Sequence, residues 1–119
     1  MNNFNQHGLT LNWKNAGSAD VASGQLVTVG EVVGVAQVDI PIGATETLAM
    51  TGVYELPKDA GASGKEITQG ASLYVDASGK LTPTGTVTEG SDTTNLTRAG
   101  VAWADAASAA TKVLIKINV

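Results

Sequence analysis

The last eight residues, Lys112-Val-Leu-Ile-Lys-Ile-Asn-Val119, indicate the fold class most clearly. Apolar side chains recur there at every second position, at Val113, Ile115, Ile117 and Val119. Successive side chains of a β-strand point to opposite faces of a sheet. A period of two therefore predicts a terminal β-strand with one buried face.

The same alternation, or a run of β-branched residues, extends over most of the chain. These segments are 9–13, 26–29, 32–38, 47–56, 73–75, 80–82 and 100–103. Gly30 separates two of them and is expected to form a turn. Only the alanine-rich segment 105–110 favours a helix, with Asp105 as its N-cap. The pattern predicts an all-β protein with at most one short helix.

Composition and charge exclude several classes of function. The 119 residues are 43% apolar, and 7 Lys and Arg stand against 11 Asp and Glu, a net charge of −4. This apolar content is too high for a disordered chain. Nucleic-acid-binding proteins usually have a basic surface, so no nucleic-acid partner is expected. No apolar run approaches the ~18 residues of a membrane span, and no signal peptide is visible, so we expect a soluble intracellular product without a membrane partner.

Side chains that carry out catalysis or bind metals are scarce. Cysteine is absent, and the single histidine, His7, lies in a polar tail that offers it no partner for general-base chemistry. The segment 61–65, Gly-Ala-Ser-Gly-Lys, departs from a phosphate-binding loop, because Asp59 replaces the first glycine and Glu66 replaces the final Ser or Thr. The other acidic residues are scattered. We therefore predict no catalytic site, no cofactor and no metal site.

A weak internal repeat indicates how the chain is organised. The blocks 24–29, 33–36 and 48–54 resemble the blocks 70–75, 99–102 and 113–119. We expect an N-terminal arm of residues 1–8 and a single β domain of residues 9–119. Within it, 24–56 and 70–119 would be an internal duplication whose two β-units pair into a small barrel or clip. The alternative is that Gly-Val-Ala recurs by chance in a chain rich in these residues.

Two polar segments interrupt the expected strands. Residues 58–65 and the threonine-rich residues 84–97 are both expected to be surface loops. In the duplication hypothesis, residues 84–97 are an insertion in the second copy.

Several blocks of the sequence, taken in order, resemble a known family. They are Asn3-Phe4-x-Gln6-x-Gly8-x-x-Leu11, Ala22-Ser-Gly24-x-x-Val27, Gly34-Val-Ala36, Gly52-Val-Tyr-Glu-Leu-Pro-Lys58, Gly70-x-x-Leu73-Tyr74-x-Asp76, Ala99-Gly-Val-Ala102 and Val113-x-Ile115-x-Ile117-Asn118. This order is similar to that of the capsid cement, or head-decoration, proteins of tailed phages. The family is often labelled a predicted RecA/RadA-type phage recombinase, a label that a chain without a Walker motif or a basic DNA face does not support.

The resemblance implies an all-β fold, a small barrel or β-clip, and a structural function. It implies homotrimers that bind the major capsid protein on the outside of the expanded capsid and stabilise it. The location would be the virion exterior, and the host cytoplasm during assembly. The polar N-terminal arm could add a strand to the capsid, with Phe4 as its anchor. The alternative is a disordered tail.

Six residues are the candidates for capsid or trimer contacts. Trp13 and Trp103 are the largest apolar side chains of a chain with only 4% aromatic residues, and either could serve as an interface anchor. The other candidates lie in the arm and are Asn3, Phe4, Gln6 and His7. A different class of function remains open at this point, a phage host-surface or carbohydrate-binding β module that uses an exposed tryptophan ring. A hydrolase with His7 as its base is a third reading.

Overall fold

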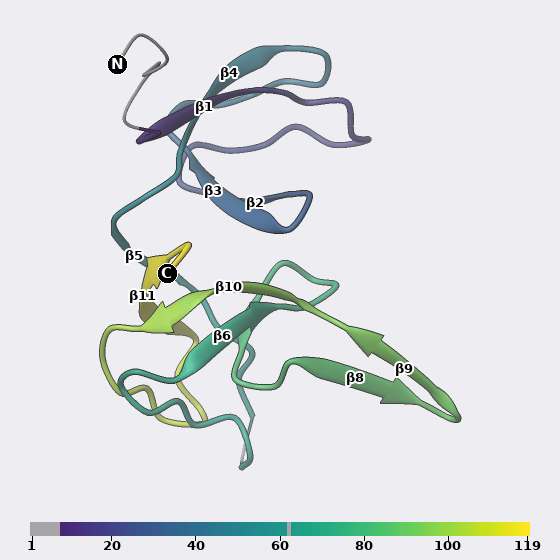
Figure 1. The fold of residues 1–119 in the computed structure, drawn as a ribbon, viewed down its shortest axis with the longest axis vertical. Coiled ribbons are helices and arrows are strands. Elements are labelled where there is room, and N and C mark those ends of the chain that lie inside the picture. Colours follow the sequence, from purple (N-terminus) through teal and green to yellow (C-terminus); the bar gives the residue numbers. More distant parts are fainter. Residues whose placement is uncertain (1–7, 62) are drawn as a thin grey trace, which may run out of the picture.

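The computed structural model describes residues 8–61 and 63–119. These residues form β-strands and no helix, which confirms the all-β prediction (Figure 1). The strands are β1 (Thr10–Lys14), β2 (Leu26–Val29), β3 (Val32–Ala36), β4 (Thr45–Ala49), β5 (Val53–Pro57), β6 (Ser72–Val75), β7 (Leu81–Thr82), β8 (Thr86–Glu89), β9 (Asp92–Asn95), β10 (Thr97–Ala102) and β11 (Lys112–Ile117).

The N-terminal sheet has the strand order β1-β4-β3-β2, and all its neighbours are antiparallel. β2 and β3 are joined by a two-residue turn, in which Gly30 has a φ of 59°. Glycine adopts this conformation without the steric cost that a side chain would add. One face of the sheet packs on a small core that consists of Val21, Val27, Ala36, Ile40 and Leu48.

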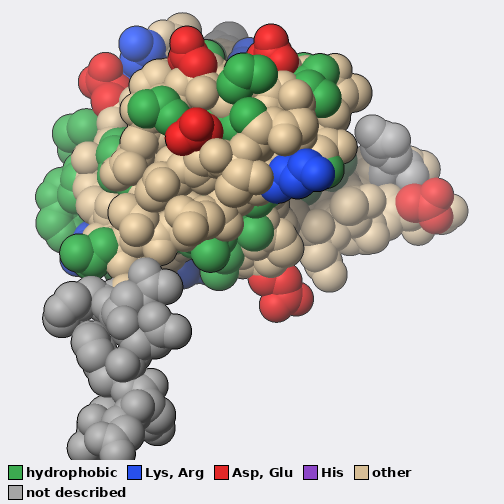
Figure 2. Space-filling model, turned by 90° about the horizontal axis from the view of Figure 1, so that it is seen from above, with side chains coloured by type: hydrophobic (Ala, Val, Ile, Leu, Met, Phe, Trp, Pro, Cys, Tyr) green, Lys and Arg blue, Asp and Glu red, His purple; other side chains and the backbone are tan. Residues whose placement is uncertain are grey.

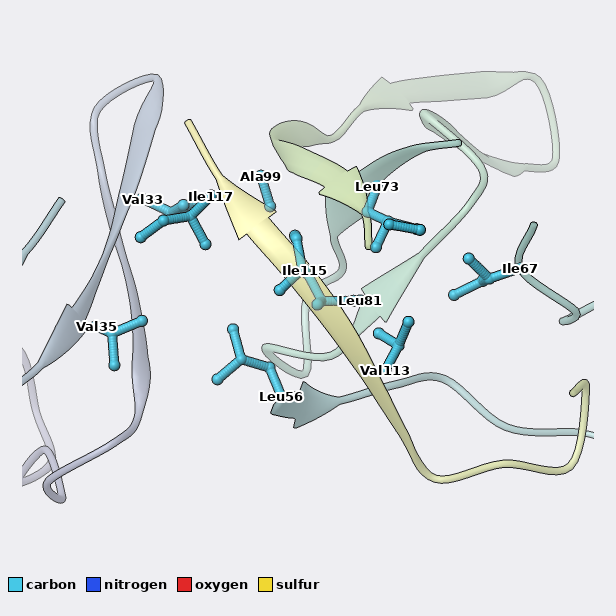
Figure 3. Packing of buried hydrophobic residues seen from close by; sticks show 11 residues of the cluster. Val33, Val35, Leu56, Ile67, Leu73, Leu81, Ala99, Val113, Ile115 and Ile117 are labelled. Atoms are coloured by element: carbon cyan, nitrogen blue, oxygen red, sulfur yellow. The ribbon is translucent and has the colours of Figure 1, made fainter. Parts of the chain in front are cut away.

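The C-terminal sheet has the order β5-β11-β10-β6-β7 and curls into a half-barrel. Its two edge strands meet at one point, where Lys58, just after β5, forms a β-bridge with Leu81 of β7. The backbone N–H of Asp59 also donates to the carbonyl of Leu81 over 2.9 Å. Leu81 is fully buried in the core of this sheet (Figure 3). The small barrel expected from the sequence is therefore present as a partly closed one.

The two sheets share a hydrophobic core. Val33 and Val35 of β3 belong to the same buried cluster as Leu56 of β5 and Ile117 of β11 (Figure 3). Burial of this apolar surface stabilises the contact between the sheets. The shared core supports our proposal that residues 9–119 form a single β domain.

The alternation at the C-terminus is confirmed within β11 but not at Val119, which follows the strand and is 48% exposed. Val113, Ile115 and Ile117 are buried, whereas Lys112 and Leu114 are exposed. Because β11 lies between β5 and β10, its buried face covers the centre of the half-barrel. The strand therefore has the position that its apolar pattern requires.

Three expectations about individual segments differ from the structure. Residues 47–56 do not form one strand, because Gly52, with a φ of 117°, redirects the chain from β4 of one sheet to β5 of the other. Residues 84–97 are not a loop but contain the hairpin of β8 and β9, which their many β-branched threonines favour. Residues 105–110 form no helix, because Ala106 is held in a β-bridge with Ile67.

The order β1-β4-β3-β2 of the N-terminal sheet matches the order β5-β11-β10-β6 within the C-terminal sheet. Backbone hydrogen bonds also correspond, since Gly24 N–H donates to Ala36 O and Gly70 N–H donates to Ala102 O, at 2.7 and 2.8 Å. β7, β8 and β9 lie between β6 and β10, where the N-terminal sheet has only a tight turn. We propose that the domain arose by internal duplication. Because β1 corresponds to β5, the proposed copies run over 10–49 and 53–117 rather than over 24–56 and 70–119.

Candidate functional site

An apolar surface covers the outward side of the C-terminal sheet. Residues directly opposite each other on paired strands point to the same side, and Lys116 lies opposite both Val53 and Val101. Leu114 lies opposite Glu55, on the same side of β11 as Lys116. The N–H of Trp103 donates to the carbonyl of Leu114 over 2.8 Å, so Trp103 continues this row. We call the surface formed by Val53, Glu55, Val101, Trp103, Lys112, Leu114 and Lys116 the Trp103 face.

The apolar side chains of the Trp103 face are partly exposed, and Leu114 at its centre lies between Lys112 and Lys116 along β11. The side chains of Trp103, Val53 and Leu114 are 48%, 40% and 38% exposed. A contiguous group of large apolar side chains on a sheet surface is typical of a protein–protein contact. Trp103 is therefore exposed and available for the role of interface anchor that the sequence predicted.

The charge on the Trp103 face is mainly basic. Lys112 and Lys116 lie on it, beside the single acidic residue Glu55. The Lys116 ammonium is 5.4 Å from the centroid of the Trp103 ring, a cation–π distance that holds the lysine over the ring. In a chain with a net charge of −4, this arrangement favours an acidic partner.

Trp13 has a different environment. Its side chain is half-buried and packs against the core of the N-terminal sheet, opposite Glu46 of β4. Part of its role is therefore to complete that core. Trp13 and Trp103 lie on different sheets, so the structure does not bring the two predicted anchors together. Leu9 and Leu11, near Trp13, remain exposed.

The four remaining candidates, Asn3, Phe4, Gln6 and His7, lie outside the described residues. The chain enters the structure at Gly8, next to β1 on the N-terminal sheet. Figure 2 shows hydrophobic side chains at several places on this end of the molecule, with acidic and basic side chains between them.

The hairpin of β8 and β9 is a feature that the sequence interpretation missed. It projects from the half-barrel (Figure 1) and, among the described residues, pairs with no other strand. A sequence signal was present, since Gly90 and Ser91 form a two-residue turn with φ positive at Gly90, a common hairpin turn. The threonines on both sides lack the apolar alternation that marks a buried strand, so the segment resembled a loop.

The described residues offer little chemistry beyond these surfaces. A shallow groove of about 420 Å³ lies between the two sheets and is lined by residues that include Val35, Ala49, Tyr54 and Glu55. Residues 8–61 and 63–119 contain no group of three or more His, Cys, Asp or Glu side chains placed to hold a metal ion. In the same part of the chain, no helix is long and apolar enough to cross a membrane.

Comparison with protein families gives the context for this architecture. A family model described as phage cement protein matches residues 5–117, nearly the full chain. The chain belongs to the phage cement protein family. This cement protein is therefore a structural, non-catalytic component that is located on the virion capsid and stabilises it. No curated protein and no solved structure matches the chain.

Proposed function

We propose that this cement protein acts as a homotrimer on the outer surface of the expanded capsid, at three-fold or quasi-three-fold positions, where it contacts the major capsid protein. The family supplies capsid binding and stabilisation. The exposed Trp103 face is the observation that supports the proposed contacts between copies and with the capsid. Exposed apolar side chains on a sheet surface are typical of a protein–protein contact.

The proposed mechanism requires no chemical step. A protein that binds only the expanded lattice stabilises that lattice by mass action. Many copies on one shell also increase the total effect of a modest individual contact. The antiparallel sheets supply a rigid body for this purpose, because their strands are held by backbone hydrogen bonds and by a shared core.

Two groups of residues are the proposed contacts. The N-terminal arm would bind the capsid through Phe4, with Asn3, Gln6 and His7 adding polar contacts, as an extended peptide adds to a sheet. Trp103 and the exposed part of Trp13 would supply anchors on the body, since aromatic side chains are enriched at interface hot spots.

Co-sedimentation with capsids tests the proposal directly. Expanded capsids that lack the cement protein, and unexpanded shells, are each mixed with increasing amounts of the purified chain. We expect saturable binding to the expanded form only, with a copy number that is a multiple of three per three-fold site. Binding to neither form would contradict the proposal and would favour a host-surface or carbohydrate-binding function.

The arm makes a separate prediction. Phe4→Ala should leave the folded body unchanged, because the core is formed by residues of the β domain, yet reduce binding to expanded capsids by about tenfold or more, as loss of an anchor does. Asn5→Ala is the matched control in the same arm. Equal binding by the Phe4→Ala variant, the control and the wild-type chain would show that the arm is not the anchor.

A further inference from the structure

The hairpin of β8 and β9 lacks the burial that normally holds a hairpin together. It is a two-stranded sheet with both outer edges unpaired. All its described side chains are exposed, including Val87 at 41%. An isolated two-stranded hairpin is only marginally stable in water. A partner surface would supply the missing burial.

The hairpin has a clear chemical character. Residues 86–95 contain two acidic residues and no basic one, so the segment carries a charge of −2. Four of the ten residues are threonine, and one is Val87. Threonine methyl groups and valine can pack on an apolar surface, while the acidic groups favour lysines at its edge.

The same chain carries a surface of complementary character. The Trp103 face has exposed apolar side chains, with Lys112 and Lys116 on either side of Leu114. Figure 1 shows the hairpin projecting from one side of the half-barrel, whereas β11 and the end of β10, after which Trp103 follows, lie on the opposite side. The hairpin therefore cannot cover the Trp103 face of its own chain, but it can cover that of another copy.

We propose that the β8–β9 hairpin of one copy lies on the Trp103 face of a second copy. Such a head-to-tail contact uses two different surfaces and closes into a ring when the rotation between copies allows it. This inference rests on the proposed homotrimer and identifies its interface. Val87 and Thr94, which lie opposite each other on one face of the hairpin, cover Trp103 and Leu114, and Asp92 on the same face lies near the lysines.

Cross-linking tests the contact without removing any element of the fold. The native chain has no cysteine, so each introduced thiol is unique. Thr94→Cys places a thiol on the hairpin face that carries Val87, and Glu55→Cys places one on the Trp103 face. With a short bismaleimide, a mixture of the two single variants should give a linked dimer, and the double variant should give a covalent trimer. Thr94→Cys mixed with Ser18→Cys, on an exposed N-terminal loop, is the control and should give no product.

A shortened variant gives the second measurement. Replacing residues 86–95 by Gly-Ser removes an element that has no place in either buried cluster, so the body should stay folded. By sedimentation equilibrium, the wild-type chain should be a trimer, and the shortened variant should dissociate at a concentration at least 100-fold higher.

The outcomes separate this inference from the proposed function. If the wild-type chain is a trimer but the shortened variant is equally trimeric, or the Thr94→Cys and Glu55→Cys mixture gives no product, the hairpin contact is wrong and the trimer stands. If the wild-type chain stays monomeric at every concentration and on expanded capsids, the trimer and the contact are both wrong, while capsid binding itself is judged by co-sedimentation.

Discussion

Lys58 is a charged residue in the buried interior, where lysine is rarely found. It is only 2% exposed, and its ammonium group donates to the carbonyl oxygens of Asp59, Ser108 and Ala110 at 2.9, 3.0 and 3.4 Å. The ammonium thereby satisfies carbonyl groups of the loop that leads into β11. Asn15, just after β1, has the corresponding place in the N-terminal sheet, where its buried amide donates to Ala19 O and Ile40 O.

We therefore predict that Lys58→Met destabilises the domain. Methionine retains most of the side-chain volume but leaves three partly buried carbonyl oxygens without their donor, which costs about 2–3 kcal/mol of unfolding free energy. Urea unfolding followed by tryptophan fluorescence measures the change. Lys112→Met, at an exposed position, is the control and should stay within about 0.5 kcal/mol of wild type. Equal stability of the two variants would refute a structural role for the buried ammonium.

At the scale of the element, two aspartates form hydrogen bonds to corresponding loops of the two sheets. Asp39 Oδ1 accepts the N–H of Ser23 at 2.8 Å, before β2, and Asp105 Oδ1 accepts the N–H of Gln69 at 2.6 Å, before β6. Each aspartate also directly precedes a residue that forms a β-bridge. Asp39 precedes Ile40, which pairs with Val21, and Asp105 precedes Ala106, which pairs with Ile67. The two halves thus use the same residue type to fix the same loop.

This correspondence predicts equal effects in the two halves. Asp39→Ala and Asp105→Ala should each lower the unfolding free energy by about 1 kcal/mol, because each removes one exposed charge-assisted hydrogen bond. Asp39→Asn and Asp105→Asn, which keep an acceptor oxygen, should lose less. Thermal unfolding of the four variants measures this. A large effect in one half and none in the other would count against the proposed duplication.

The elements also show where sequence interpretation succeeds and fails. β11 was predictable because Val113, Ile115 and Ile117 are buried on one face and their alternation is local. The break at Gly52 was not predictable from the sequence. It exists because Tyr54 and Leu56 belong to a different sheet from β4, and local alternation of apolar residues does not indicate which sheet a segment joins. In the segment after Asp105, alanine propensity favours a helix, but pairing with Ile67 outweighs that weak preference.

The candidate site was also only partly predictable from the sequence. The sequence predicted that Trp103 could be an anchor because it is large and one of only two tryptophans. It could not predict that Trp103 is exposed while Trp13 is half-buried, since exposure depends on the neighbours that β11 and β4 supply. The lysines of the Trp103 face were likewise scattered in sequence, and only the antiparallel register places Lys116 beside the Trp103 ring.

At the scale of the whole molecule, the side chain of Asn118 joins the two sheets. Its Nδ2 donates to the carbonyls of Val33 and Met50 at 2.7 and 2.8 Å, and its Oδ1 accepts the N–H of Val33 at 3.1 Å. The backbone of Asn118 has a φ of 59°, a left-handed conformation that asparagine tolerates better than most residues. Asparagine at this position therefore fits the backbone conformation and also connects the end of β11 to the N-terminal sheet by hydrogen bonds.

We predict that Asn118→Ala weakens the coupling between the sheets more than it weakens either sheet. The variant loses three hydrogen bonds at a partly exposed site and places alanine in a left-handed conformation, a combined loss of about 2 kcal/mol. Asn118→Gly removes the hydrogen bonds but relieves the backbone, so it should be less destabilised. Because the shared cluster around Val33 and Val35 then has less support, calorimetry should show a broader transition, with a van't Hoff enthalpy below the calorimetric one. A sharp two-state transition in both variants, at the wild-type midpoint, would show that the hydrophobic contact alone holds the two sheets together.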